Sequence, residues 1–292
     1  MSDAAPSDSL PAAPPPDLGS LRARLDDIDT QLHDLLMRRV EIVAQGVTKA
    51  KTGLALRPGR EAQIIRRLLA RHEGVLPPHA LVRLWRELLA GTTVIQGRHL
   101  IAVCDTDPQA ALTQIAREHF GALTPLRVHR SPAQALADVS AGTASVAVLP
   151  LPTEADSPGA AWWTALLQQD TPRIHVIARL PFWAPRTEGA PRAQALVVAA
   201  SAPDPSGRDC SLLGLECSAD LSRARLASLL AAAGLAPRGI VLRRIAGAPL
   251  ALALVEVEGW LTDDDARLAR LDPALRRPVV LGSYAVPEGA SA

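Results

Sequence analysis

Apolar residues in the first part of the chain recur every third or fourth position, the spacing that places side chains on one face of an α-helix. This pattern runs from Leu21 to Val43, and no proline interrupts the chain from there to Pro58. It predicts a helix over residues 17–51, which at ~1.5 Å per residue would be roughly 50 Å long. A helix of this length usually lies against another long helix, often from a second chain.

The same spacing continues in two shorter segments, which a glycine and two prolines separate. These segments predict helices over residues 58–72 and 79–96. Residues 1–16 are rich in proline, alanine and serine, a composition typical of a disordered tail. We therefore expect an all-α, three-helix domain over residues 17–97 behind a disordered tail.

The pattern changes after residue 98, where short apolar runs alternate with helical stretches. This βαβαβ rhythm predicts an α/β region over residues 98–202 with a parallel sheet, of the periplasmic-binding-like kind. The predicted elements are strands at 99–105, 126–129, 144–149, 173–178 and 195–200 and helices at 108–119 and 132–141.

A further change follows the linker DPSG at residues 204–207. The order of elements over residues 208–287 is βαββαβ, the ferredoxin-like plan. The predicted elements are strands at 211–216, 240–245, 251–258 and 279–283 and helices at 221–233 and 264–271. The fold class is thus multidomain, with three parts after the tail.

Composition narrows the classes of function. Hydrophobic residues make up 48% of the 292 positions, enough for buried cores, and 31 basic against 30 acidic residues leave a net charge of +1. This balance argues against nucleic acid or an acidic membrane surface as a partner. The first twenty residues do not have the pattern of a signal peptide, and no apolar run approaches ~20 residues, so we expect no membrane association and a cytoplasmic location.

The three cysteines, Cys104, Cys210 and Cys217, do not have the spacing of a metal site. They favour free thiols in a reducing compartment. We expect neither a metal nor a cofactor.

Several charged and polar residues of the helical domain form a candidate site. The candidates are Arg22, Arg39, Lys49 and Lys51 on the first helix, Arg57, Arg60 and Glu61 at the start of the second, and Thr92 and Gln96 at the end of the third. Each of them taken alone is more often a solvated surface residue. Together they would line a pocket with several cations, one carboxylate and neutral hydrogen-bonding groups, which suits a small dianion.

The segments that carry these residues resemble a known family. LRARLDDIDTQLHDLLMRR (21–39), VTKAK (47–51), RPGRE (57–61) and the T-x-x-x-Q at 92–96 are similar to the all-helical, AroQ-type chorismate mutases. The resemblance implies an isomerase of aromatic amino acid biosynthesis that converts chorismate to prephenate. It also implies an intertwined homodimer whose two active sites are shared between the chains.

The resemblance further implies roles for the residues that bind the ends of the substrate. Arg22 would bind a substrate carboxylate from the partner chain, and Arg39 would bind one within its own chain. Glu61 would bind the substrate hydroxyl, Arg60 would order the pocket, and Thr92 would stand where the family commonly has serine.

At the ether oxygen of the breaking bond, the resemblance implies Lys51 on one side and Gln96 on the other. The spacing from Arg39 to Lys51 is about one residue longer than is usual in the family, so Lys49 stays an alternative. The family often has aspartate at the position of Arg57, which leaves the role of Arg57 open. The chemistry needs no nucleophile, since a cationic, preorganised pocket can hold the reactive conformer and stabilise the charge on the oxygen.

The rest of the chain resembles the prephenate dehydratases and the regulatory ACT domain that follows them. ASVAVLPLPTEADSPGAAW (144–162) carries the first likeness, and EVEGW (256–260) with VVLGSYAVP (279–287) carries the second. The dehydratase motifs are replaced: PRAQALVV (191–198) stands in place of the Thr-Arg-Phe motif, and CDTDPQAAL (104–112) in place of the glycine-rich loop.

Three functions follow from these likenesses. The first is a chorismate mutase with a non-catalytic dehydratase-like region and an ACT-like domain, to which an aromatic amino acid effector could bind. The alternatives are a bifunctional chorismate mutase/prephenate dehydratase and a non-catalytic, amino-acid-sensing regulatory protein. The joint presence of Arg22, Arg39, Arg60, Glu61 and Gln96 favours the enzyme, because dimerisation alone would not need them.

Overall fold

The computed structural model describes residues 17–49, 56–95 and 99–289. Contacts between residues divide the chain into two compact units, Met1–Lys51 and Thr52–Ala292. Within the described residues, none of the helices has the length and apolar character needed to cross a membrane.

The described residues of the first unit form one long helix, α1 (Leu18–Lys49), of 32 residues. Its bounds agree with the predicted ones as far as the described residues reach. Large apolar side chains along it are exposed, and we call the set Leu25, Ile28, Leu32, Leu35 and Ile42 the α1 stripe. Their spacing alternates between three and four residues over the first four members, which is the heptad pattern of helices that pack against other helices.

The second unit begins with two helices, α2 (Pro58–Ala70) and α3 (Pro78–Ile95). Both were predicted, and both begin with a proline, whose fixed φ and missing N–H suit the first turn of a helix. Ala62 and Ile65 of α2 and Val82 and Leu89 of α3 pack in one buried cluster with Phe182 and with Ala285. The two helices are therefore packed against the part of the chain that follows them.

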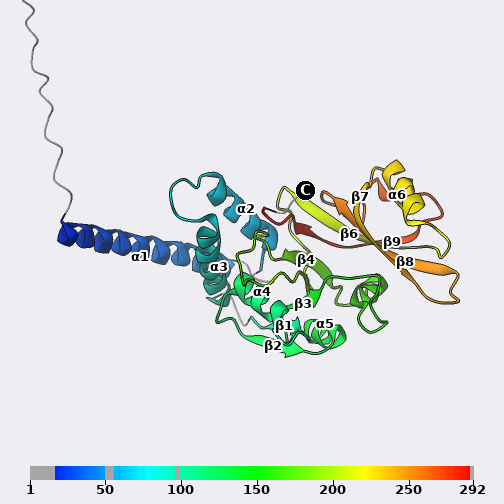
Figure 1. The fold of residues 1–292 in the computed structure, drawn as a ribbon, viewed down its shortest axis with the longest axis horizontal. Helices are drawn as coiled ribbons and strands as arrows, with labels where there is room; N and C mark the ends of the chain where they lie inside the picture. The colour runs from blue at the N-terminus through cyan, green and yellow to red at the C-terminus, as the bar shows by residue number, and fades with distance from the viewer. Residues whose placement is uncertain (1–16, 50–55, 96–98, 290–292) are drawn as a thin grey trace, which may run out of the picture. The chain divides into compact units, whose positions relative to one another are not determined.

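A nine-stranded sheet forms the centre of this unit, in the order β2-β1-β3-β5-β4-β9-β6-β8-β7. Figure 1 shows the part with β1, β2, β3 and β4 and the part with β6, β7, β8 and β9. Its strands are β1 (Ile101–Cys104), β2 (Leu126–His129), β3 (Val146–Pro150), β4 (His175–Leu180), β5 (Ala195–Ala199), β6 (Asp209–Ser218), β7 (Pro237–Arg244), β8 (Leu250–Glu258) and β9 (Arg276–Ala285). Each predicted strand is present; the bounds of β2 agree with the prediction, and those of the others are shifted by a few residues.

The direction of one strand corrects the prediction. β1 pairs in parallel with β2 and β3, as expected, but β5 is antiparallel to both β3 and β4. The reason is the connection: β4 and β5 are joined by a loop without a helix, and two strands joined in this way can pair antiparallel.

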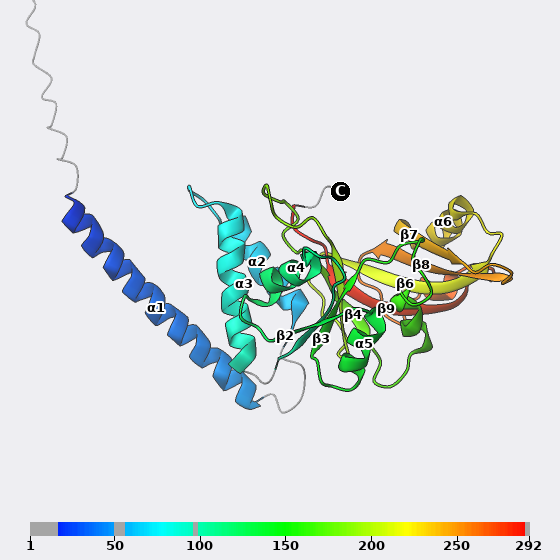
Figure 2. The same cartoon turned by 60° about the horizontal axis from the view of Figure 1, so that its bottom comes forward.

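Helices cover both faces of the sheet (Figure 2). They are α4 (Ala111–Phe120), α5 (Pro132–Ser140) and α6 (Arg223–Ala232), with two 3₁₀ helices, η1 (Trp162–Gln168) and η2 (Leu268–Arg270). α5 and η1 pack in one buried cluster, and α4 packs in another on the opposite face of β1, β3 and β5. α6 packs on β6 and β8 in a third cluster. The three cysteines are free and buried, as predicted for the thiols.

The strand order β9-β6-β8-β7 with α6 on one face has the ferredoxin-like arrangement, apart from its second helix. The predicted helix at 264–271 is wrong, because only the short η2 forms there. Asp265 accepts hydrogen bonds from the backbone N–H and the guanidinium of Arg267, each at 2.9 Å, and Asp264 accepts one from Thr262. Such local bonds compete with a helix, and Pro273 follows closely.

The two halves of the sheet meet at one close contact. Val176 of β4 pairs with Gly282 of β9. Gly282 has a φ of +132°, and a Cβ built on it would lie 2.1 Å from the carbonyl oxygen of Val176. A residue without a side chain is therefore needed for the halves to join into one sheet.

Candidate functional site

The two arginines predicted on the first helix lie far apart along α1. Arg22 and Arg39 are 17 positions apart, which corresponds to roughly 25 Å along a helix. Arg39 continues the α1 stripe, since it stands four residues after Leu35 and three before Ile42. A charged residue thus occupies an apolar position of the heptad pattern.

The residues predicted for the ether oxygen are not placed by the structure. Lys51 and Gln96 lie outside the described residues. Lys49 ends α1, and its side chain is also outside the described part.

The start of α2 is held by a carboxylate from the linker before β6. Asp204 accepts hydrogen bonds from the backbone N–H groups of Gly59 at 2.9 Å and Arg60 at 3.0 Å. The N-cap residue Arg57 supplies no capping side chain, and its guanidinium lies 3.5 Å from Asp204. Asp204 therefore replaces the missing cap and also faces the positive end of the helix dipole.

Glu61 is buried in an ion pair with Arg86 of α3. The Nη1 group of Arg86 donates to Oε2 of Glu61 at 2.8 Å, and the Arg86 side chain is 4% exposed. Burial raises the pKa of the Glu61 carboxyl, and the charge of Arg86 acts in the opposite direction. The guanidinium carbon of Arg86 also lies 5.0 Å from the ring centre of Phe182, so the pair is packed against the loop after β4.

Thr92 is buried near the end of α3. Its hydroxyl donates to the carbonyl oxygens of Leu88 at 3.1 Å and Leu89 at 2.9 Å. Arg60 is exposed on α2, where its Nη1 group donates to Gln63 at 3.3 Å. Within the described residues, the second unit thus carries Glu61, Arg60 and Thr92 on neighbouring helices.

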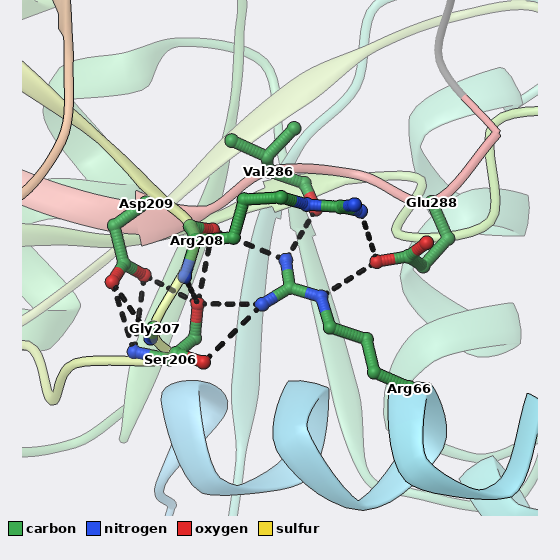
Figure 3. Close-up of polar contacts among 7 residues, drawn as sticks. All are labelled: Arg66, Ser206, Gly207, Arg208, Asp209, Val286 and Glu288. Carbon is green, nitrogen blue, oxygen red and sulfur yellow. Dashed lines mark hydrogen bonds and ion pairs between the residues drawn. The ribbon is translucent and has the colours of Figure 1, made fainter. Parts of the chain in front are cut away.

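A second arginine of α2 fixes the helix to the sheet (Figure 3). Arg66 donates to Oε1 of Glu288 at 2.6 Å and to the carbonyl oxygens of Arg208 at 3.1 Å and Val286 at 2.7 Å. It also donates to the hydroxyl of Ser206 at 2.9 Å. We call this arrangement the Arg66 anchor.

The loop that receives Arg66 is itself built around a carboxylate. Asp209 accepts hydrogen bonds from the backbone N–H groups of Ser206 and Gly207 and from the Ser206 hydroxyl at 2.5 Å. This fixes the Ser206 oxygen atoms toward Arg66. The linker DPSG, which by sequence is only a connection, therefore binds α2 through Asp204 and Ser206.

Sequence reasoning missed Arg86, Arg66 and Asp204. For Arg86 a signal exists, because it stands between Val82 and Leu89 on the buried face of α3, where an arginine is out of place. Arg66 and Asp204 give no comparable signal, since their partners lie 140 or more positions away along the chain.

The helical region is similar to a known protein family. The family model described as chorismate mutase type II matches residues 21–97. We call residues 21–97, which match this family model, the mutase region. This mutase region spans α1, α2 and α3 and therefore extends over both compact units.

The chain is similar over part of its length to longer proteins. The bifunctional chorismate mutase/prephenate dehydratase of Pseudomonas aeruginosa is 27% identical over 143 residues, which are 46% of this chain and 38% of the relative. The chain thus aligns with well under half of that relative's length.

Two solved structures have a partial likeness to the chain. One is described as a novel type of quorum quenching acylase, with a TM-score of 0.49, 18% identity and coverage of 67% of this chain and 97% of that structure. The other is a prephenate dehydratase from Streptococcus mutans, with a TM-score of 0.45, 14% identity and coverage of 64% and 97%. No activity follows from either likeness.

Proposed function

We propose that the protein is a chorismate mutase that rearranges chorismate to prephenate. The observation that carries the proposal is the family match over residues 21–97, which includes all of the candidate site residues. The reaction is a single pericyclic step, so the protein must hold the reactive conformer and stabilise charge that develops on the ether oxygen. Arginine and lysine side chains in a preorganised pocket supply both effects.

The proposed roles follow the resemblance. Arg22 and Arg39 bind the two substrate carboxylates, and Gln96 with Lys51, or Lys49, binds the ether oxygen. Arg60 orders the pocket and Thr92 contributes a hydroxyl. The part played by Arg57 stays open.

For Glu61 we propose that the free carboxylate oxygen receives the substrate hydroxyl. Only Oε2 is used by Arg86, and Oε1 accepts no hydrogen bond from the described residues. Arg86 would then keep Glu61 charged inside the pocket, because it opposes the effect of burial on the pKa. We propose Arg86 as the positioning partner of Glu61.

The active site is proposed to need two chains. Arg22 and Arg39 are roughly 25 Å apart along one helix, too far to bind a single small molecule together. Two antiparallel α1 helices would bring Arg22 of one chain beside Arg39 of the other. The exposed α1 stripe supplies the apolar surface for such a homodimer.

The region after the mutase is proposed to consist of a dehydratase-like part, residues 98–202, and an ACT-like part, residues 208–287. Dehydratase activity is the second candidate, because a relative carries both names. Against it stands the sequence PRAQALVV at the place of the Thr-Arg-Phe motif. An aromatic amino acid effector is proposed as a ligand of the ACT-like part, and the soluble enzyme is proposed to be cytoplasmic.

The test is to follow chorismate consumption by absorbance, with separate detection of prephenate and phenylpyruvate. We expect prephenate alone, and a loss of rate of at least about 100-fold in Arg39→Ala. The matched control is Arg38→Ala, an exposed neighbour on the same helix, which should keep the rate. Phenylpyruvate would establish the bifunctional enzyme, and absence of chorismate consumption by the unaltered protein would refute the proposal.

A further inference from the structure

A cleft lies at one end of the nine-stranded sheet, outside the mutase region. Its volume is about 740 Å³, which is within the range of sites for small organic ligands. It is lined by residues near the ends of β4, β6, β7, β8 and β9, by the loop between β4 and β5, and by the segment after β9. We call it the arginine cleft, for its lining residues Arg179, Arg186, Arg192 and Arg238.

The lining of this cleft is strongly cationic. Four arginines face it, and Glu256 is the one carboxylate among its lining residues. The formal charge of the lining is therefore +3. The remaining polar groups are neutral, since burial raises the pKa of the Tyr284 phenol well above its ordinary value.

Arg179 is a fixed member of the cleft. Its Nη1 group donates to Glu256 and to the Tyr284 hydroxyl, both at 3.1 Å, and its Nη2 group donates to Gln194 at 2.9 Å. Glu256 is thus already compensated by Arg179. The three other arginines are left without a carboxylate from the cleft itself.

Those three arginines have unused donors. Arg192 makes no ion pair with any described residue, and Arg238 makes only a 3.7 Å contact with the Cys210 sulfur. Arg186 donates from Nη1 to Glu118 at 2.7 Å, while its buried Nε and Nη2 groups have no partner among the described residues. Buried donors without acceptors are costly, so a turn of Arg186 toward an anion would be favourable.

We propose that the arginine cleft binds a small organic dianion, whose two negative charges are held by Arg186, Arg192 and Arg238. Guanidinium groups suit planar carboxylates and phosphates because they donate two parallel hydrogen bonds. Pro181, Pro185 and Pro287 form an apolar wall that would face the carbon skeleton. The shared chemistry is a double negative charge on a compact body, carried either by two carboxylates or by one phosphate ester.

Calorimetric titration with four probes tests the proposal: malonate, benzylmalonate, phenyl phosphate and the neutral benzamide. We expect benzylmalonate or phenyl phosphate to bind more tightly than malonate, and benzamide not to bind. The tighter of the two identifies carboxylate or phosphate as the preferred group. Binding should weaken as salt is added.

Substitutions of the lining arginines test whether the probes bind in the arginine cleft. Arg192→Gln and Arg238→Gln change exposed side chains, and Arg186→Gln changes the half-paired one; each should weaken the best probe about tenfold or more. The matched control is Arg130→Gln, an exposed arginine just after β2, the strand at the opposite edge of the sheet. Equal binding by the three variants and the control, or no binding of either dianion by the unaltered protein, would overturn the proposal. Since the cleft lies outside residues 21–97, neither result bears on the mutase activity.

Discussion

The Glu61–Arg86 pair combines a large desolvation cost with a strong mutual attraction. Both side chains are nearly excluded from water, at 12% and 4% exposure. Removing one partner from such a pair leaves an uncompensated buried charge, which usually destabilises more than removing both. The pair therefore ties the geometry of α2 and α3 to the ionisation of Glu61.

Arg86→Met should lower the free energy of unfolding by about 3–5 kcal/mol at neutral pH. Burial raises the folded-state pKa of Glu61 above its ordinary value, so its contribution to stability is present at low pH and is lost as pH rises through that raised pKa. Without Arg86 the pKa rises further, and the variant should be less destabilised at pH 5 than at pH 7.5. Urea unfolding at the two pH values measures this.

The control is the double variant Arg86→Met with Glu61→Leu. It removes both charges, so its loss of stability should be smaller and should vary less between the two pH values. A loss in Arg86→Met that is the same at both pH values would contradict the account of the pair.

At this scale the sequence predicted Glu61 but not its partner. The resemblance assigned a role to Glu61 because RPGRE matches a family motif. Arg86 is marked only as an arginine on the apolar face of α3, and its partner, 25 positions earlier on another helix, is known only from the fold. The motif thus points to Glu61 and not to the arginine that pairs with it.

At the scale of elements, α2 depends on groups that are distant in sequence. Its start is capped by Asp204, and its middle is held by the Arg66 anchor. Short isolated helices are marginally stable in water, and α2 has only 13 residues. The sheet and the linker therefore decide where this helix lies, and with it Arg60 and Glu61.

Arg66→Met should destabilise the second unit by about 2–4 kcal/mol, because several charge-assisted hydrogen bonds of a largely buried side chain are lost together. Arg67→Met on the same helix is the matched control, since Arg67 is exposed. Hydrogen exchange should be faster over residues 58–70 in Arg66→Met alone. Equal protection of α2 in both variants would argue against the anchor.

The α1 stripe gives a prediction of its own. Leu32→Glu places a charge within the exposed apolar row, whereas Gln31→Glu adds the same charge one position away, outside the stripe. If the stripe is the surface of a homodimer, Leu32→Glu should give monomers with little mutase activity, and Gln31→Glu should not. Light scattering after gel filtration measures the mass, and two variants of equal mass would refute the role of the stripe.

The elements differ in how well the sequence predicted them. The strand Leu126–His129 was predicted with its observed bounds, because its alternation of apolar and polar residues between turn signals is a local property. The direction of β5 was not, because it depends on the path of the loop after β4. The helix predicted over residues 264–271 does not form, because the side chains of Asp264 and Asp265 accept local hydrogen bonds that compete with a helix.

At the scale of the whole second unit, the two parts predicted as separate share one sheet. The contact of Val176 with Gly282 is the register pair that joins them. The pattern of apolar residues does not predict this pairing, because the pairing of two strands more than 100 residues apart produces no periodicity in the sequence. A glycine within the strand pattern VVLGSYAVP is the one local hint.

Gly282→Ala should therefore separate or distort the two halves. A Cβ there would lie 2.1 Å from the Val176 oxygen, whereas at Gly259, with a φ of +90°, no atom lies within 4 Å. Gly259→Ala thus has the strain of a positive φ without the clash. We expect Gly282→Ala to cost about 1–3 kcal/mol more than Gly259→Ala, by thermal or urea unfolding. Equal losses of stability in the two variants would contradict this account, because they would show that the junction accepts a side chain at residue 282.

The position of β9 in this sheet has a consequence for how the protein is made. β9 is the ninth strand along the chain, yet it lies between β4 and β6 near the middle of the sheet. On the ribosome, β4 and β6 are synthesised well before the strand that will lie between them. The edges of β4 and β6 that β9 will join therefore stay unpaired until residues 276–285 emerge from the ribosome. In that interval these edges can pair with other nascent chains.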